Sequence, residues 1–262
     1  MKLRAVFFLF NILVFLALLI AAVPPFFIHG QGGIAVMGNV WIILLVFALI
    51  VGGMDFYFIR NRRLFILLEA EDWPSLLAWL EHRLYVKRNL NRTYSNLLIR
   101  TALSVSNLDA IRKLEAEIRR KRPVLLRALG VGLGIPILLR QNWKAIAEYY
   151  GPLADDPKTR QRDWAVWCRA VALGRERIDQ LMELLASRDV SLRLLSWEIL
   201  ERRSRFLSDA QRAALAASKV ELKDMLNGSG GDGMLRKSRE DYLISLVLSS
   251  QVDRVKSDLL AS

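Results

Sequence analysis

The sequence predicts an all-α protein in which a two-helix transmembrane hairpin precedes a solenoid of paired helices. Two observations lead to this prediction. Before Gly53 the only charged residues are Lys2 and Arg4, and beyond it bulky residues recur every 35 positions. Of the 262 residues, 53% are hydrophobic and 24% are charged, a combination that a uniformly soluble domain rarely shows. We therefore expect the apolar residues to be concentrated in a membrane-embedded part.

Two apolar segments are each long enough to cross a bilayer. Residues 5–28 and 34–59 exceed the roughly 20 helical residues that span the hydrocarbon core. Basic residues flank their outer ends: Lys2, Arg4, Arg60, Arg62 and Arg63. Because Lys and Arg beside a span tend to stay in the cytoplasm, we expect two spans with both termini cytoplasmic. The compact hairpin, without eukaryotic targeting signals, favours a bacterial inner membrane.

The first segment also fits a second interpretation, a cleaved signal peptide. It has a charged start and two alanines near its end. Its apolar run is, however, longer than the 7–15 residues usual for a signal peptide, and Pro24 and Pro25 follow. In either case the second span would deliver residues 60–262 to the cytoplasm.

Two polar side chains, Asn11 and Asp55, interrupt the predicted spans. At 1.5 Å rise per residue, both would lie roughly 8–10 Å inside the cytoplasmic boundary. A carboxylate in lipid is costly and usually faces a partner or water. One hypothesis is that Asp55 and Asn11 pair across the hairpin, where Gly52 and Gly53 allow close approach. The alternative is that Asp55 extends to the interface.

Beyond the spans, the same kind of segment begins every 35 residues. The four segments open at Trp73, Leu108, Trp143 and Ile178. Three of them follow an Asp or Asn, which suits a helix N-cap. A second bulky residue comes three positions later: Leu76, Ile111, Ile146 and Leu181. The second helix of each unit has its own column: Tyr94, Leu129, Trp164 and Ile199. Such a period, with two helices per unit, is typical of a helical solenoid.

The unit resembles the tetratricopeptide repeat (TPR), which has 34 residues and opens W-x-x-L-G-x-x-Y. The segment "WKAIAEYY", from Trp143 to Tyr150, approaches this pattern. The small fifth residue of the pattern is replaced by Leu77, Arg112 and Met182, and the proline near the repeat end is missing. The resemblance covers about residues 68–203 and implies a TPR-like α-solenoid. The layout of a hairpin followed by repeats is also similar to that of HemY-type bacterial membrane proteins.

The expected domains are the hairpin at 1–63, the repeats at 64–226, and a flexible break with a C-terminal capping helix at 227–262. The break, "NGSGGDG", is rich in turn formers. Solenoids need a polar terminal cap, so capping is the expected role of the last helix, and a partner-seeking tail is the alternative.

The apolar segment 124–139 is too short, at 16 residues, to span a membrane, and it contains three glycines and Pro136. We expect a buried repeat helix there. A re-entrant or membrane-surface segment is the alternative.

Charge gives a further clue. From residue 60 onward the chain carries 36 basic and 25 acidic residues, a net charge of +11. Cations beside a membrane gain roughly 1 kcal/mol each near anionic lipid. The expected headgroup contacts are Arg60, Arg62, Arg63, Lys87 and Arg88. An ordinary solvated basic face is the alternative, and the lack of a base-reading motif argues against nucleic acid.

Residues suited to catalysis are scarce. His29 and His82 have no nearby ligand set, and Cys168 falls in a buried helical column. We therefore expect no enzyme activity, metal or cofactor. The sequence favours a membrane-anchored helical-repeat scaffold or assembly factor that binds a protein partner at the cytoplasmic face. The alternative is a subunit of a transport or secretion complex that contacts its partners through the hairpin.

Overall fold

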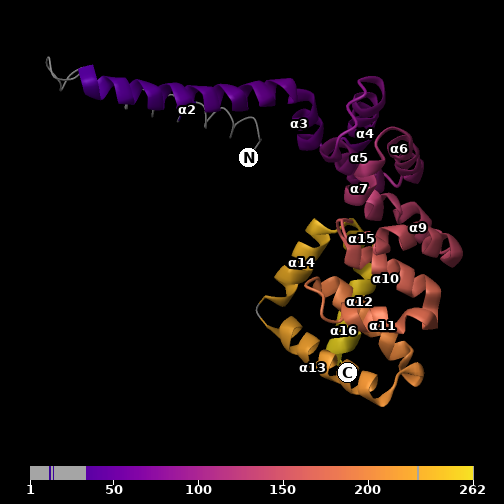
Figure 1. Ribbon diagram of the computed structural model, residues 1–262. Coiled ribbons are helices and arrows are strands. Elements are labelled where there is room, and N and C mark those ends of the chain that lie inside the picture. The colour runs from indigo at the N-terminus through magenta and orange to yellow at the C-terminus, as the bar shows by residue number, and fades with distance from the viewer. Residues whose placement is uncertain (1–11, 13, 15–33, 229, 262) are drawn as a thin grey trace. The chain divides into compact units, whose positions relative to one another are not determined.

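The computed structural model describes Ile12, Val14 and residues 34–228 and 230–261 (Figure 1). All regular structure in these residues is helical and no strand forms, which confirms the all-α prediction. Asn11 and nearly all of the first predicted span lie outside the described residues. The chain divides into two compact units, Met1–Trp79 and Leu80–Ser262.

In the first unit, the second predicted span forms a single helix, α2 (Ile34–Arg60), followed by α3 (Arg62–Glu69). The bend between them is fixed by Asn61, which is buried and donates from Nδ2 to the Tyr57 carbonyl oxygen at 2.9 Å. The rings of Tyr57, Phe58 and Phe65 meet at the same place. Within the described part of the chain, no helix is both long and apolar enough to cross a membrane.

The helices that open the repeats begin at the predicted residues. They are α4 (Trp73–Glu81), α6 (Leu108–Lys121), α9 (Trp143–Asp155) and α11 (Ile178–Leu184). The helices that follow them are α5 (Arg92–Ser104), α7 (Leu126–Leu133), α10 (Arg162–Leu173) and α12 (Val190–Arg202). Short elements fill the connections: η1 (His82–Val86), η2 (Pro123–Leu125), α8 (Ile135–Leu139), η3 (Gly174–Arg177) and η4 (Ser204–Phe206).

The 35-residue spacing has a local cause, a turn that is used three times. Its first residue has positive φ and is Glu71, Ser106 or Gln141, at 52°, 54° and 53°. The next residue caps the helix: Asp72, Asn107 and Asn142 each accept a hydrogen bond from the backbone N–H three positions on. This bond satisfies a donor that would otherwise lack a partner in the first helical turn. In the fourth unit Arg177 provides no such cap.

The core column lies three residues after each helix start. Leu76, Ile111, Ile146 and Leu181 are all fully buried. The four residues at the helix starts are not: Trp73, Leu108 and Ile178 are partly exposed, and Trp143 is 50% exposed. Side chains on a helix lean toward its N-terminus, so a first-turn residue covers the preceding turn rather than the core. The bulky residues that reveal the period are therefore not the ones that fill the interior.

The glycine-rich apolar segment is part of the core of the second unit. Residues 129–136 are all buried, whereas Val124 at its start is 73% exposed. Gly134 is needed for close packing, because a Cβ there would lie 2.5 Å from the hydroxyl oxygen of Tyr150. The same hydroxyl donates to the Val131 carbonyl oxygen at 3.1 Å. The middle of the segment is therefore buried as expected, but residues 124–139 form η2, α7 and α8 rather than a single repeat helix.

The C-terminal region holds more structure than one capping helix. It comprises α13 (Asp209–Asn227), α14 (Gly231–Asp241), α15 (Leu243–Val247) and α16 (Ser249–Ala261). Of the predicted break, Asn227 ends α13 and residues 231–233 begin α14. Gly231 begins α14 where a Cβ would meet the Leu226 carbonyl oxygen at 2.5 Å. Both α14 and α16 pack against α12, so these helices cover the end of the repeats (Figure 1).

We expect Gly134→Ala to lower the free energy of unfolding by about 1–3 kcal/mol, because its methyl group would overpack the contact with Tyr150. Gly151→Ala is the matched control, since Gly151 lies within α9 and a Cβ there meets nothing within 4 Å. Alanine is the better helix former, so Gly151→Ala should raise the stability by up to about 1 kcal/mol. Chemical denaturation of the full chain measures both, and changes of equal sign would contradict the packing argument.

We also expect Ile146→Ala to lower the free energy of unfolding by about 2–5 kcal/mol, because it empties a fully buried site. Trp143→Ala should lower it by at most about 1 kcal/mol, since half of the indole is already exposed. The same denaturation experiment compares the two. A larger effect at Trp143 would place the core column at the helix starts instead.

Candidate functional site

A buried carboxylate, Asp189, joins the last repeat to the C-terminal helices. As the N-cap of α12 it accepts hydrogen bonds from the backbone N–H groups of Ser191 and Leu192 at 3.0 and 3.5 Å. The indole Nε1 of Trp164, on α10, donates to its second oxygen at 2.8 Å. The hydroxyl of Ser238, on α14, donates to the first oxygen at 2.6 Å. Three helices thus share a single carboxylate.

Hydroxyl groups extend this polar junction to α15. The Oγ of Ser245 lies 3.0 Å from that of Ser238 and 2.9 Å from that of Ser191. All three serines are buried. Burial raises the pKa of the Asp189 carboxyl group above its ordinary value, and the hydrogen bonds from Ser238 and Trp164 oppose the rise. Every partner holds the carboxylate in place, and none is a base that could activate a serine.

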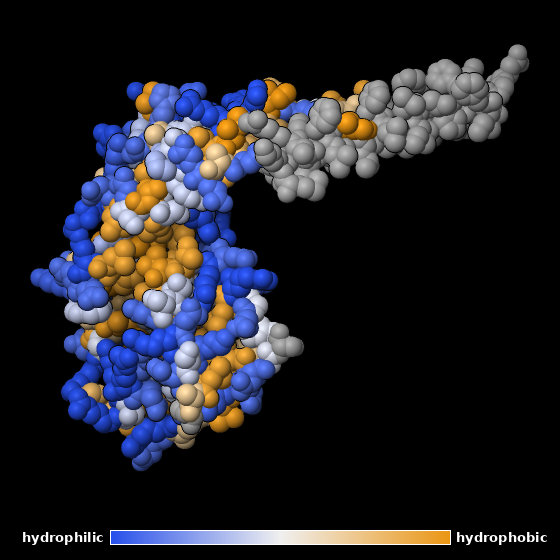
Figure 2. Space-filling model, turned by 180° about the vertical axis from the view of Figure 1, so that it is seen from behind, coloured by the Kyte–Doolittle hydropathy of each residue, from blue (hydrophilic) through white to orange (hydrophobic). Residues whose placement is uncertain are grey.

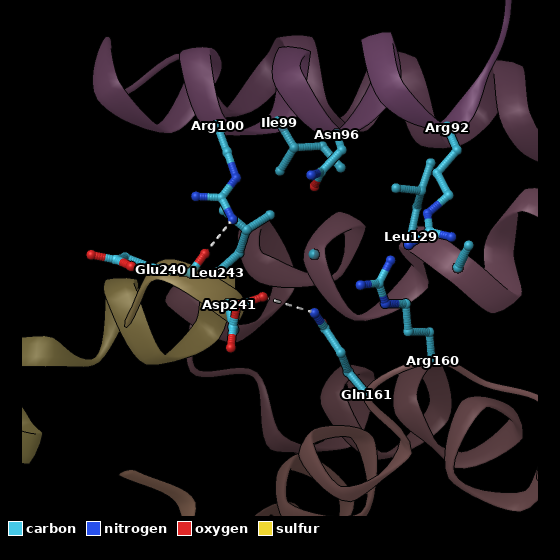
Figure 3. A pocket seen from close by; sticks show the side chains of 12 residues that line it. Arg92, Asn96, Ile99, Arg100, Leu129, Arg160, Gln161, Glu240, Asp241 and Leu243 are labelled. Carbon is cyan, nitrogen blue, oxygen red and sulfur yellow. Dashed lines mark hydrogen bonds between the residues drawn. The ribbon is translucent and has the colours of Figure 1, made fainter. Parts of the chain in front are cut away.

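A cleft of about 180 Å³ opens beside this junction (Figure 3). We call it the basic cleft, because three arginines from separate segments line it. Arg92 and Arg100 lie on α5, and Arg160 lies in the turn before α10. Its remaining lining residues are Asn96, Ile99, Ala128, Leu129, Gly132, Gln161, Glu240, Asp241 and Leu243. A second hollow of about 400 Å³, lined by Trp164 and Tyr242 among others, shares Gln161 with the cleft.

The C-terminal wall of the basic cleft is the junction between α14 and α15. Arg100 Nη2 donates to the Glu240 carbonyl oxygen at 2.7 Å, and Gln161 Nε2 lies 3.4 Å from the Asp241 carbonyl oxygen. Both contacts join residues far apart in the sequence. The cleft therefore exists only when the C-terminal helices are packed on the repeats.

The basic residues differ in whether they form ion pairs. Arg60, Arg62, Arg63, Lys87 and Arg88 are all exposed and form no ion pair with a described residue. The residues of a later basic run, Arg119, Arg120 and Lys121, instead pair with Glu115 or Glu117. Arg60, Arg62 and Arg63 belong to the first unit, whereas Lys87 and Arg88 belong to the second.

Two connecting segments, residues 86–91 from the end of η1 onward and residues 121–124 where α6 meets η2, form what we call the loop edge, and the first contains Lys87 and Arg88. The Arg122 guanidinium joins the loops by donating from Nη1 to the Leu90 carbonyl oxygen at 2.9 Å. Val86 is 67% exposed and Val124 is 73% exposed. The sequence analysis predicted the cations of this edge as lipid contacts but not its exposed valines, although Val86 directly precedes Lys87 and Val124 follows Arg122 by two residues.

The remaining candidate residues are placed as follows. The pairing of Asp55 with Asn11 remains a hypothesis, because Asn11 lies outside the described residues. Burial raises the pKa of the Cys168 thiol well above its ordinary value, as expected of a structural thiol. His82 is exposed, and the described residues contain no group of three or more potential metal ligands. The four residues at the helix starts mark the repeats without forming a common site.

On the face seen in Figure 2, hydrophilic residues surround an area of apolar side chains over the larger body. Exposed large apolar residues of the second unit include Leu139 and Trp143, which flank the turn between α8 and α9 and are 46% and 50% exposed. An aromatic side chain exposed to this degree is available to a partner.

We expect Asp189→Asn to lower the free energy of unfolding at neutral pH by about 1–3 kcal/mol, because an amide nitrogen would face a donor of Trp164 or Ser238. The pKa of Asp189 is raised in the folded state, so the folded chain binds its proton more readily than the unfolded chain. The natural protein should therefore lose part of its stability advantage over the variant as pH rises from about 3.8, the ordinary pKa of an Asp, through the raised pKa of Asp189. Denaturation at several pH values measures it.

Asp224→Asn, an exposed substitution on α13, is the control and should change the stability by less than about 0.5 kcal/mol. If the stability advantage of the natural protein over Asp189→Asn instead grew with pH, the upward shift of the Asp189 pKa would be contradicted.

Comparison with known proteins finds similarity in the helical repeats and the C-terminal helices. The profile of a family described as "Uncharacterised Treponema protein" matches residues 110–257, more than half of the chain. A protein of Treponema pallidum (strain Nichols), described as "Uncharacterized protein", is 25% identical over 108 residues. The match spans 41% of this chain and 34% of that protein, about a third of its length. No solved structure matches. By the extent of the profile match, the chain belongs to the family described as "Uncharacterised Treponema protein".

Proposed function

We propose that this protein is a membrane-anchored helical-repeat scaffold or assembly factor that holds a protein partner at the cytoplasmic face of a bacterial inner membrane. The observation that carries the proposal is Trp143, a half-exposed indole at the start of a repeat helix. Large aromatic side chains contribute strongly to protein interfaces, and repeat proteins offer extended surfaces for binding. The recurring helix pairs support a TPR-like α-solenoid, the architecture that the 35-residue period predicts.

The anchor in this proposal is the hairpin formed by residues 5–28 and α2. Large apolar side chains along the described part of α2 are exposed: Leu45, Val46, Phe47, Leu49, Ile50, Met54, Phe56, Tyr57 and Ile59. Such a surface needs a cover, and a bilayer provides one. The arginines that follow α2 favour cytoplasmic termini.

The loop edge provides a second membrane contact. Lys87 and Arg88 form no ion pair with a described residue, and they share the loop edge with the exposed side chains of Val86 and Val124. Apolar tips flanked by cations suit the headgroup region of an anionic bilayer, where each cation contributes roughly 1 kcal/mol. The exposed apolar side chains beside these cations support the proposal of lipid contact.

A subunit of a transport or secretion complex is the second candidate, because the exposed face of α2 suits a neighbouring transmembrane helix as well as lipid. Exchanging residues 1–59 for an unrelated hairpin separates the two. A scaffold should retain its partner and its function, whereas a subunit that acts through the hairpin should lose both.

We expect Trp143→Ala to remove the partner from the full-length protein in native membranes. The partner is detected by crosslinking and mild-detergent co-purification. Because this substitution should leave the fold nearly as stable, loss of the partner would reflect the surface itself. The measured quantity is the yield of co-purified protein, with an expected decrease of at least tenfold.

Val220→Ala is the matched control, since Val220 is 60% exposed on α13, away from the turn between α8 and α9. It should leave the yield unchanged. If the partner still co-purifies with the double variant Trp143→Ala, Leu139→Ser, this surface is not the binding site.

A further inference from the structure

We propose that the basic cleft binds a phosphate group, through the guanidinium groups of Arg92, Arg100 and Arg160. This proposal does not depend on the membrane anchor or on a protein partner. It follows from the charge, the hydrogen bonding and the size of the cleft.

The cleft has more positive than negative side chains, because three arginines line it beside two carboxylates, Glu240 and Asp241. Arg92 and Arg160 form no hydrogen bond or ion pair through their side chains with any described residue, and both are exposed. Figure 3 shows them extending toward one another from α5 and from the turn before α10. Arg100 donates to a carbonyl oxygen, which is a neutral acceptor. The Arg100 guanidinium lies on the other side of the cleft, beside Glu240 and Asp241 (Figure 3). Three guanidiniums thus line one cleft, and an anion bound there would lower their mutual repulsion.

The carboxylates of the cleft do not fulfil this role. The Glu240 side chain extends away from Arg92 and Arg160 in Figure 3, and its carboxylate lies 3.9 Å from Arg236 on the same helix. The Asp241 side chain is exposed and forms no ion pair with a described residue. The α14–α15 junction contributes carbonyl oxygens to the cleft wall through these two residues.

The donor set fits a phosphate group. A guanidinium presents several N–H groups in a fixed plane, which match the oxygens of a phosphate or a carboxylate in pairs. Three guanidiniums, with the amides of Asn96 and Gln161 beside them, offer more donors than one carboxylate can accept, whereas a phosphate has three terminal oxygens. The number of donors thus favours phosphate.

Size and rigidity agree with a small ligand. The volume of about 180 Å³ lies below the roughly 300–1,000 Å³ of pockets for drug-sized molecules. The apolar side is tightly packed, because a Cβ on Gly132 would lie 3.1 Å from Leu243 Cδ1. Arg160 is held by its backbone N–H, which donates to the Arg127 carbonyl oxygen at 2.7 Å. The next residue, Gln161, has φ of 65° and is the N-cap of α10, so the start of that helix fixes the turn that carries Arg160.

The test uses inorganic phosphate and the full-length protein in detergent, at constant ionic strength balanced with chloride. We expect saturable binding by titration calorimetry and a rise in the unfolding temperature with phosphate concentration. Arg92→Gln and Arg160→Gln should each weaken the affinity at least tenfold. Arg160→Lys, which keeps the charge but loses the planar donor set, should have an intermediate effect.

Arg140→Gln is the matched control, because Arg140 is exposed at the end of α8, outside the cleft. It removes the same charge and should change the affinity less than twofold. Circular dichroism confirms that each variant is folded. The absence of saturable binding, or an equal loss with Arg140→Gln and Arg92→Gln, would overturn the proposal.

Competition then identifies the source of the phosphate group. Glycerol phosphate represents a soluble ester, and a short-chain phosphatidic acid represents a lipid headgroup. The competitor with the lower inhibition constant identifies the source, and failure of both to displace phosphate would overturn the proposal for any phosphate ester.

Discussion

The second unit depends on one constraint, that the buried carboxylate of Asp189 must keep its hydrogen-bond donors. A buried charge without partners is strongly unfavourable, so the groups that contact it cannot separate freely. Its donors come from Trp164 on α10, from the start of α12, and from Ser238 on α14. The repeats and the C-terminal helices are therefore expected to unfold together. The family match across residues 110–257 includes both parts, as it would if they form one structural unit.

The same constraint positions the basic cleft. Ser238 and Ser245 belong to the polar junction, and the residues between them form the turn from α14 to α15. That turn provides the carbonyl oxygens of Glu240 and Asp241, which meet Arg100 and Gln161. A polar network in the core thus fixes a polar surface several residues away. Without it, the cleft would lose one wall, and its arginines would lie on an open helical face.

The sequence predicted the helix starts well because a local signal sets them. A residue with positive φ followed by Asp or Asn defines the first turn of α4, α6 and α9. The signal fails in the fourth unit, where α11 ends at Leu184 and Asp189 starts α12 early. Ile199 is consequently only partly buried, although the period placed it with Trp164 in one column. Asp189 stands directly before the apolar run "VSLRLLSWEIL", where an Asp predicts a helix N-cap. The 35-residue period, applied to the fourth unit, placed the helix start later.

The cleft could not be predicted, because nothing in the sequence distinguishes its arginines from the other basic residues. Net charge counts every cation equally, but the structure separates them by their partners. Arg119, Arg120 and Lys121 share two carboxylates of their own helix, Glu115 and Glu117, so most of their charge is compensated there. Basic residues that form no ion pair with the described part of the chain remain around the junction of α2 and α3, at the loop edge and in the cleft. The first two stand beside exposed apolar side chains, as expected for lipid contact, whereas the cleft combines its charge with amide donors and a closed wall. The proposed lipid contacts and the proposed phosphate site therefore differ in their surroundings, although both consist of basic residues. The hydrogen-bond partners of each cation distinguish the two, and the net charge does not.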